Sequence, residues 1–190
     1  MREFTAINPA TGENIRSYQS FPADGIEECH VKARIAFESW SQTSIKSRIA
    51  HLEKGAQWLK DNLDEVVDIV SLDNGKPKVE ALMADVSPVL QAIPYYKKNA
   101  EKYLKDESIS VWKSLPTKKV YRTYSPLGVV GIIAPWNYPL STPMGKVLTA
   151  LVAGNSVILK PSEVTALVNT KIMEFFKACN LPPNVFQMIE

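Results

Sequence analysis

The carboxamide of Asn137 is the side chain whose setting most clearly suggests chemistry. It lies in PWNYP (135–139), directly after the apolar run GVVGIIA (128–134), with a proline close by on each side. Prolines restrict the backbone around them, so an amide in this setting would be held in a fixed position. Asn is also common in turns, and Asn137 taken alone could be an ordinary turn residue.

A second group of polar residues follows a second apolar stretch. Lys160, Ser162 and Glu163 stand in LKPSE (159–163), at the end of the short apolar segment that begins at Ser156. In an open parallel sheet, ligands bind outside the carboxyl ends of the strands. We therefore expect Lys160 and Glu163 at the same sheet edge as Asn137. The alternative is a solvated pair at a helix start, where acidic residues are favoured.

The second half of the sequence alternates between strand and helix patterns. This alternation predicts a parallel sheet with right-handed crossovers. The segment from Val129 to Ala134 is apolar throughout, so we expect this strand to be covered on both faces. The predicted order is strand 129–134, helix 142–152, strand 156–159, helix 164–179 and strand 185–189.

One further strand is predicted just before this unit. The residues from Val120 to Tyr124 alternate in polarity, which is typical of a half-exposed strand, and a turn at 125–128 would join it to the next strand. With this strand, the mixed region extends over about 118–190.

The first half is predicted to be mostly helical, over about 23–105. NPATGE (8–13) precedes it as a turn between two short strands or within an extended arm. Thr43 or Ser44 could cap the second helix, and Asn74-Gly75 should end the third. Pro88 and Pro94 should kink or break the fourth. The four apolar stripes are Ile26, Cys29, Ala33, Ala36, Phe37 and Trp40; Ile45, Ile49, Leu52, Ala56 and Leu59; Leu63, Val66, Val67 and Val70; and Val79, Leu82, Met83, Val86, Leu90, Ile93, Tyr96 and Tyr103.

The composition is that of an ordinary globular chain and excludes several function classes. The 190 residues are 45% hydrophobic and 22% charged, with a net charge of +2, so nothing points to nucleic acid or an anionic membrane. The longest apolar run is too short to span a bilayer, and the first residues lack a signal peptide's apolar core. We expect a cytoplasmic protein. Its cysteines and histidines show no metal-binding spacing, so no metal site is predicted.

Several motifs in this order resemble the aldehyde dehydrogenase superfamily. PWNYP, AGN (153–155) and LKPSE stand at the spacing typical of that family, and INPATGE (7–13) and DNGKPKVEA (73–81) resemble two further family stretches. The resemblance covers essentially the whole chain but only the front part of the family's longer sequence. It implies an α/β fold in which N-terminal helices precede the first strands of a Rossmann-like parallel sheet. Residues 1–190 would form the N-terminal part of the NAD-binding domain, with the catalytic domain absent.

The resemblance also implies roles for the polar residues. Asn137 resembles the family's oxyanion-hole donor, which stabilises a carbonyl oxygen as it becomes negative. Lys160 and Glu163 resemble its contacts to the adenosine ribose, and a carboxylate there would repel a 2′-phosphate, so NAD is expected over NADP. The family binds its dinucleotide without a GxGxxG turn at this position, and none is present here. The other residues expected near the cofactor are Ile133, Ala134, Pro135, Trp136 and Ser162.

The implied reaction is oxidation of an aldehyde to a carboxylate, and it needs a nucleophilic cysteine and a carboxylate base. In the family both lie beyond LKPSE. Cys179 at a helix C-terminus and Cys29 on an apolar stripe are predicted to be structural. The isolated chain is therefore expected to be inactive.

The sequence leaves three possibilities open. The chain is the front part of a dehydrogenase, one half of a two-chain enzyme, or a non-catalytic nucleotide-binding or oligomerisation module. The expected partners are an aldehyde in the complete enzyme and either further copies of the chain or a missing C-terminal half.

Overall fold

A parallel sheet lies at the centre of the computed structural model, which describes residues 3–111 and 117–190. Its strand order is β5-β6-β7, and the register pairs Val129 with Ser156 and Ile133 with Lys160. The predicted alternation of strands and helices is confirmed. The elements are β5 (Val129–Ile133), α6 (Ser141–Val152), β6 (Ser156–Lys160), the short 3₁₀ helix η2 (Glu163–Thr165), α7 (Ala166–Cys179) and β7 (Phe186–Met188).

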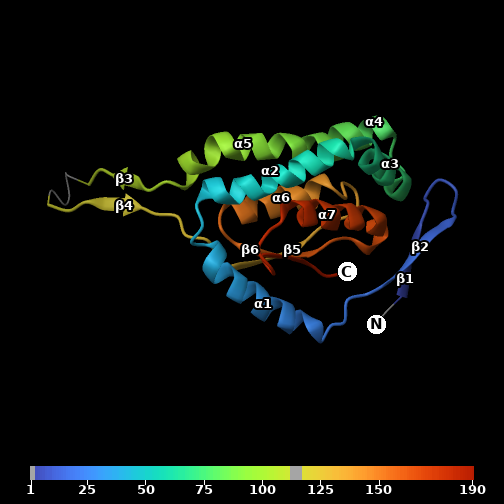
Figure 1. The fold of residues 1–190 in the computed structure, drawn as a ribbon, viewed down its shortest axis with the longest axis horizontal. Coiled ribbons are helices and arrows are strands. Elements are labelled where there is room, and N and C mark those ends of the chain that lie inside the picture. Colours follow the sequence, from blue (N-terminus) through green and yellow to red (C-terminus); the bar gives the residue numbers. More distant parts are fainter. Residues whose placement is uncertain (1–2, 112–116) are drawn as a thin grey trace.

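Helices cover the two faces of this sheet unequally (Figure 1). α6 and α7 pack on one face, where Ile132 and Leu159 are buried, whereas α1 (Gly25–Trp40) lies on the other and mainly across β6. The expectation that β5 is covered on both faces is wrong, because Ile133 is 81% exposed. In the described part of the chain β5 is an edge strand, and α1 leaves its outer end uncovered.

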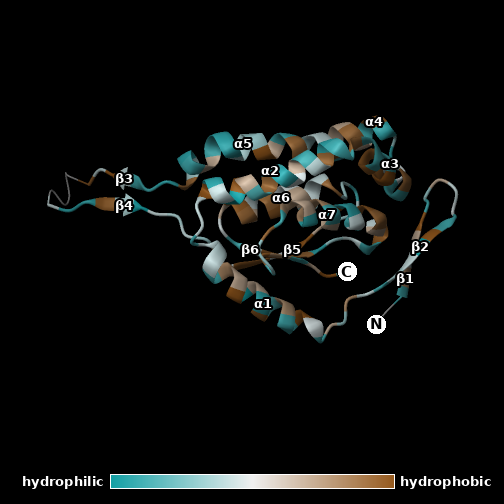
Figure 2. Ribbon diagram, viewed as in Figure 1, coloured by the Kyte–Doolittle hydropathy of each residue, from teal (hydrophilic) through white to brown (hydrophobic). Residues whose placement is uncertain are grey.

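A further layer of helices packs on α6 and α7. α2 (Ile45–Asp61) contacts both α7 and α5 (Ser87–Leu104), and α3 (Leu63–Asn74) also packs on α7. Hydrophobic and hydrophilic residues alternate along these helices (Figure 2), and the buried ones join a single core with α6 and α7. Ser44 is the cap of α2, since its hydroxyl accepts a hydrogen bond from the Ser47 amide. α3 ends at Gly75 as predicted, with a left-handed φ of 84°.

The predicted fourth helix is divided, but not as its prolines suggested. It begins as α4 (Lys78–Glu80), widens into the π-helix η1 (Ala81–Val86) and continues as α5. Pro88 lies just after the junction of η1 and α5, and α5 runs through Pro94 without ending. Three members of its predicted stripe, Val79, Met83 and Tyr103, are exposed.

Two antiparallel hairpins extend from the helical body. β1 (Glu3–Ile7) and β2 (Asn14–Gln19) flank the predicted NPATGE turn. β3 (Glu107–Ile109) and β4 (Val120–Arg122) form an arm that projects from the end of α5 (Figure 1). The predicted strand at 120–124 is therefore shorter, and its partner is β3, which the sequence did not reveal.

Candidate active site

The segments that carry the predicted site residues leave the sheet at the same edge. The amide of Ala134 donates a hydrogen bond of 3.0 Å to the carbonyl oxygen of Lys160, one step beyond the β5–β6 ladder. The loop 135–140 then leads from β5 into α6, and 161–162 leads from β6 into η2. Asn137, Lys160 and Glu163 thus stand at the carboxyl edge of one parallel sheet, where open α/β folds bind their ligands.

Asn137 is exposed, and its carboxamide makes no hydrogen bond within residues 3–111 and 117–190. The backbone of this residue, by contrast, is held. Its carbonyl oxygen accepts a hydrogen bond of 2.9 Å from the Lys76 ammonium. The side chain is therefore available to an incoming ligand while its main chain is fixed.

The contacts that fix this loop come from the end of α3 and from η1. The carboxamide of Asn74 donates to the carbonyl of Trp136 at 2.9 Å. Lys76 also pairs with Asp85 at 2.7 Å, and both side chains are buried, at 6% and 0% exposed. The sequence pattern attributed the fixed backbone to prolines alone and did not reveal this pair. The family-like stretch DNGKPKVEA (73–81) contains Asn74 and Lys76, so it could have pointed to these two residues. Asp85 lies outside that stretch, and no sequence motif marks it.

Lys160 and Glu163 form an ion pair of 2.6 Å at the rim, with side chains 40% and 57% exposed. They line a hollow of about 410 Å³, together with Glu3, Phe4, Ser20 and Glu190. Both charged groups can therefore be reached by a polar ligand. A carboxylate and an ammonium at such a rim suit a vicinal diol, because the carboxylate accepts hydrogen bonds from its hydroxyls and the ammonium donates to its oxygens.

The remaining predicted cofactor residues differ in how accessible they are. Ile133 and Trp136 are exposed, at 81% and 55%, and Pro135 is also exposed, whereas Ala134 is buried. Ser162 is 7% exposed, and its hydroxyl accepts a hydrogen bond from the Val164 amide at the start of η2. Its side chain caps this helix turn.

Neither cysteine stands in the loops that follow β5 and β6. Cys179 is fully buried at the end of α7, and burial raises the pKa of its thiol to about 12. A thiol with so high a pKa is almost entirely protonated at neutral pH and is a poor nucleophile. Cys29 is partly exposed on α1, less buried than its place on an apolar stripe suggested.

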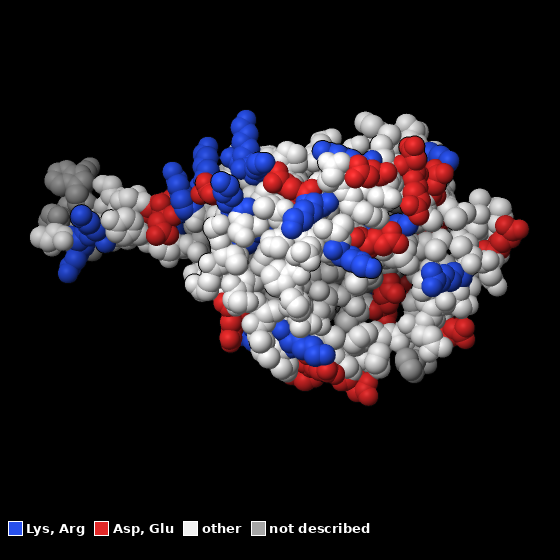
Figure 3. Space-filling model, viewed as in Figure 1, with Lys and Arg blue, Asp and Glu red and all other residues white. Residues whose placement is uncertain are grey.

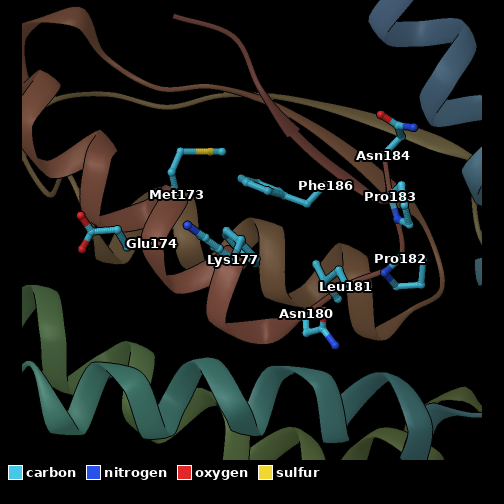
Figure 4. A pocket seen from close by; sticks show the side chains of 10 residues that line it. Met173, Glu174, Lys177, Asn180, Leu181, Pro182, Pro183, Asn184 and Phe186 are labelled. Atoms are coloured by element: carbon cyan, nitrogen blue, oxygen red, sulfur yellow. The ribbon is translucent and has the colours of Figure 1, made fainter.

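A second hollow, of about 450 Å³, lies between α7 and the segment that leads into β7 (Figure 4). Met173 and Phe186 line it, and its charged groups are Glu174 and Lys177. It begins near the amino end of β7, away from the strand ends that carry Asn137 and Lys160. It brings together no group suited to the predicted chemistry, so we place the candidate site at the carboxyl edge.

The distribution of charged side chains on the surface is consistent with the small net charge of +2. Both acidic and basic side chains are spread over the face shown in Figure 3. In the described ranges no cluster of His, Cys, Asp or Glu could hold a metal ion. None of the helices in those ranges is both long and apolar enough to cross a membrane.

A parallel sheet flanked by helices, with polar side chains at its carboxyl edge, defines an open α/β protein of the ligand-binding type. Comparison with known proteins narrows this class. The model described as "Aldehyde dehydrogenase family" matches residues 1–190, and the chain belongs to that family.

Curated relatives share about a third of their aligned residues with this chain. A 4,4'-diapolycopene aldehyde oxidase from a Methylomonas species is 33% identical over 190 residues, which cover 100% of this chain and 36% of that protein. The aldehyde dehydrogenase (NAD(P)+) 1 of Saccharomyces cerevisiae is 34% identical over 184 residues, covering 96% and 36%. The chain therefore spans little more than a third of the length of these relatives.

Solved structures give the same result. An indole-3-acetaldehyde dehydrogenase in apo form superposes with a TM-score of 0.86 at 31% identity, covering 98% of this chain and 44% of that one. A betaine aldehyde dehydrogenase from Staphylococcus aureus, in complex with NAD+, gives 0.89 at 30% identity, covering 98% and 37%. The helices and the sheet of this chain thus match the front part of the family's fold.

Proposed function

We propose that the chain supplies the oxyanion donor and part of the dinucleotide site of an NAD(P)-dependent enzyme that oxidises aldehydes to carboxylates. The observation that carries this proposal is the common rim. Asn137 follows β5, Lys160 and Glu163 follow β6, and the Ala134–Lys160 hydrogen bond brings the two strand ends together. Family membership supports the same function.

In this proposal Asn137 acts on the carbonyl oxygen of the aldehyde. When a thiolate adds to the carbonyl carbon, the oxygen becomes negatively charged, and the carboxamide donates an N–H to it. A donor already in place is worth about 3 kcal/mol in the transition state because it does not have to reorganise. The exposed side chain and the held backbone of Asn137 suit this role.

The residues of the rim fit the adenosine end of a dinucleotide. Glu163 can accept hydrogen bonds from ribose hydroxyls, and Lys160 can donate to the same oxygens. A carboxylate in this position repels a 2′-phosphate, which favours NAD over NADP. Bound NAD would supply the acceptor for hydride from the substrate. The exposed Trp136 and Ile133 would lie along its approach.

In this proposal neither cysteine is the nucleophile, since Cys179 is buried and Cys29 lies within α1 rather than in the loops that follow β5 and β6. We therefore propose that aldehyde oxidation needs residues outside these 190, whether in the same polypeptide or in a second one. The division into a helical region up to about 105 and a mixed region from about 118 belongs to this proposal, as does a cytoplasmic location.

A non-catalytic role in assembly is the second candidate. The observation that favours it is the β3–β4 arm, which projects from the body and exposes Tyr121 at 55%. An exposed strand pair can join a sheet of another copy. Light scattering of the chain with and without the arm would show whether it drives self-association.

The direct test has two arms. Thermal melting of the chain should show a cooperative transition whose midpoint rises with NAD and rises less with NADP, because a ligand that binds only the folded state stabilises it. The complete enzyme should form NADH with an aldehyde, while the 190-residue chain alone should not. NADH formation by the chain alone would contradict the assignment of the nucleophile to another segment, and the lack of it in the complete enzyme would reject the function.

A further inference from the structure

We propose that Lys76 and Asp85 are positioning residues, a buried ion pair that holds the backbone of 136–141 so that the Asn137 carboxamide points at the rim without having to reorganise. The inference rests on the proposed role of Asn137 as an oxyanion donor. It adds a supporting device to that role, and it assigns a function to two charges that lie inside the protein.

The ammonium of Lys76 makes three contacts at once. It donates to Asp85 Oδ2 at 2.7 Å and to the carbonyl oxygen of Asn137 at 2.9 Å. It also lies 4.4 Å from the ring centroid of Tyr138, which is within the range of a cation–π contact. One cation thus fixes the main chain of Asn137 and the side chain of its neighbour.

The carboxylate of Asp85 holds the other end of the same loop. Its Oδ1 accepts hydrogen bonds from the amides of Leu140 and Ser141, at 3.0 and 3.1 Å. These amides open α6, and α6 has no cap from its own N-cap side chain. The first amides of a helix lack partners within the helix and carry a partial positive charge, so a carboxylate satisfies both needs.

The location of the pair argues for more than a stabilising contact. Both side chains are at least nine-tenths buried, and burying two charges costs solvation that their mutual attraction only partly returns. Apolar residues would stabilise the same space as well or better. What apolar residues would not supply is the set of hydrogen bonds to Asn137, Leu140 and Ser141.

The backbone conformation around Asp85 also supports a functional role for the pair. Asp85 lies in η1, a π-helical segment, and π-bulges are rare and frequent at functional sites. Asp85 is buried with Ala81 and Val86 on the side of η1 that faces the start of α6.

All of these contacts reach the main chain of the loop or the Tyr138 ring, and none uses the Asn137 carboxamide. Asn74 adds a hydrogen bond to the carbonyl of Trp136 at 2.9 Å. The loop is thus held at 136, 137, 138, 140 and 141 from one side, which leaves the donor free on the other. A donor held in this way is what electrostatic stabilisation of an oxyanion requires.

The main test is a double variant of the complete enzyme, Lys76→Met with Asp85→Asn. It removes both charges together, so no unpaired charge is left inside, and the Asn carbonyl can still accept from the amides of Leu140 and Ser141. The donor to the Asn137 carbonyl and the cation over the Tyr138 ring are lost. We expect kcat to fall about 100-fold, as for a small misplacement of a reacting group, with the KM for NAD unchanged. Hydrogen exchange of the peptide that contains 136–141 should become faster.

Two further variants separate positioning from folding. Lys171→Met removes another poorly exposed lysine, which pairs with Glu65 and Glu174 away from the rim, and should leave kcat and exchange at 136–141 unchanged. Lys76→Arg keeps the charge opposite Asp85 but alters the donor geometry. Its melting temperature should stay close to that of the unaltered enzyme, while exchange at 136–141 becomes faster and kcat falls. It serves as the test if the double variant fails to fold.

The possible results lead to different conclusions. A folded double variant with unchanged kcat and unchanged exchange would overturn the inference, and so would a Lys76→Arg enzyme in which exchange of 136–141 becomes faster while kcat stays unchanged. If the unaltered enzyme formed no NADH, the proposed function would fail instead. The exchange of 136–141 would then decide by itself whether the pair holds the loop, since that measurement needs no turnover.

Discussion

The amide of Ala134 donates a hydrogen bond to the carbonyl of Lys160, at 3.0 Å, just beyond the last paired residues of β5 and β6. This bond joins two segments that are 26 positions apart in the sequence. Because parallel strands end at the same edge, it places the Asn137 loop and the Lys160–Glu163 pair on one rim. The roles proposed for these residues depend on this adjacency, which substitutions at the rim can test.

Replacing Asn137 by Ala should lower kcat of the complete enzyme by about 10² to 10³, because one oxyanion donor is removed. Binding of NAD should change little, since in the proposed role the carboxamide acts on the substrate oxygen. Steady-state kinetics with NAD and an aldehyde would measure both. Asn99→Ala, on α5, is a matched control, because its carboxamide only donates to the Tyr95 carbonyl. An unchanged kcat in Asn137→Ala would rule out the role.

Replacing Glu163 by Gln should shift the preference from NAD towards NADP. The change removes the negative charge that opposes a 2′-phosphate but keeps an oxygen for the ribose hydroxyls. A shift of about tenfold in the ratio of the two dissociation constants corresponds to about 1.4 kcal/mol. Calorimetric titration of each cofactor would measure it. Glu174→Gln, a carboxylate on α7 away from the rim, should leave the ratio unchanged.

The two thiols should differ in reactivity. Burial raises the pKa of Cys179 to about 12 from an ordinary value of 9.0, so at pH 8 its thiolate is about a thousandfold rarer than that of an ordinary thiol. Raising the pH towards 12 increases its thiolate fraction. A disulfide reagent at pH 8 should modify Cys29 quickly and Cys179 only after unfolding. Rapid modification of two thiols in the native chain would contradict this, and Cys29→Ser should abolish the fast phase.

Gly55 and Gly145 should respond in opposite directions to replacement by Ala. A Cβ on Gly55 would lie 2.5 Å from Cys179 Sγ and 2.8 Å from the Phe175 ring, between α2 and α7. Overpacking of this kind costs about 1 to 3 kcal/mol. A Cβ on Gly145 meets nothing within 4 Å, and Ala stabilises a helix interior by about 0.5 to 1 kcal/mol. Urea unfolding would give both values, and equal effects would contradict the close packing of α2 on α7.

Local sequence patterns were sufficient for most of the elements and for placing Asn137, Lys160 and Glu163 at one edge of the sheet. The alternation after residue 128, the Ser44 cap and the Gly75 stop are determined by residues close in the chain, and the family motifs lie in continuous stretches. These patterns gave wrong or incomplete predictions where a segment packs or pairs with one that is distant in the sequence. The apolar run of β5 did not show that one of its faces is open, and residues 120–124 did not show that they pair with 107–109.

The sequence by itself determined which polar groups stand at the carboxyl edge of the sheet and which family the chain belongs to, because periodicity and motif spacing are local properties of the chain. Only the tertiary structure decided how Asn137 is held. The prolines beside it restrict a few dihedral angles, but the hydrogen bonds to its loop come from Asn74, Lys76 and Asp85, more than 50 positions earlier. Such contacts depend on how α3, η1 and α6 pack together, and no pattern within a single segment encodes that packing.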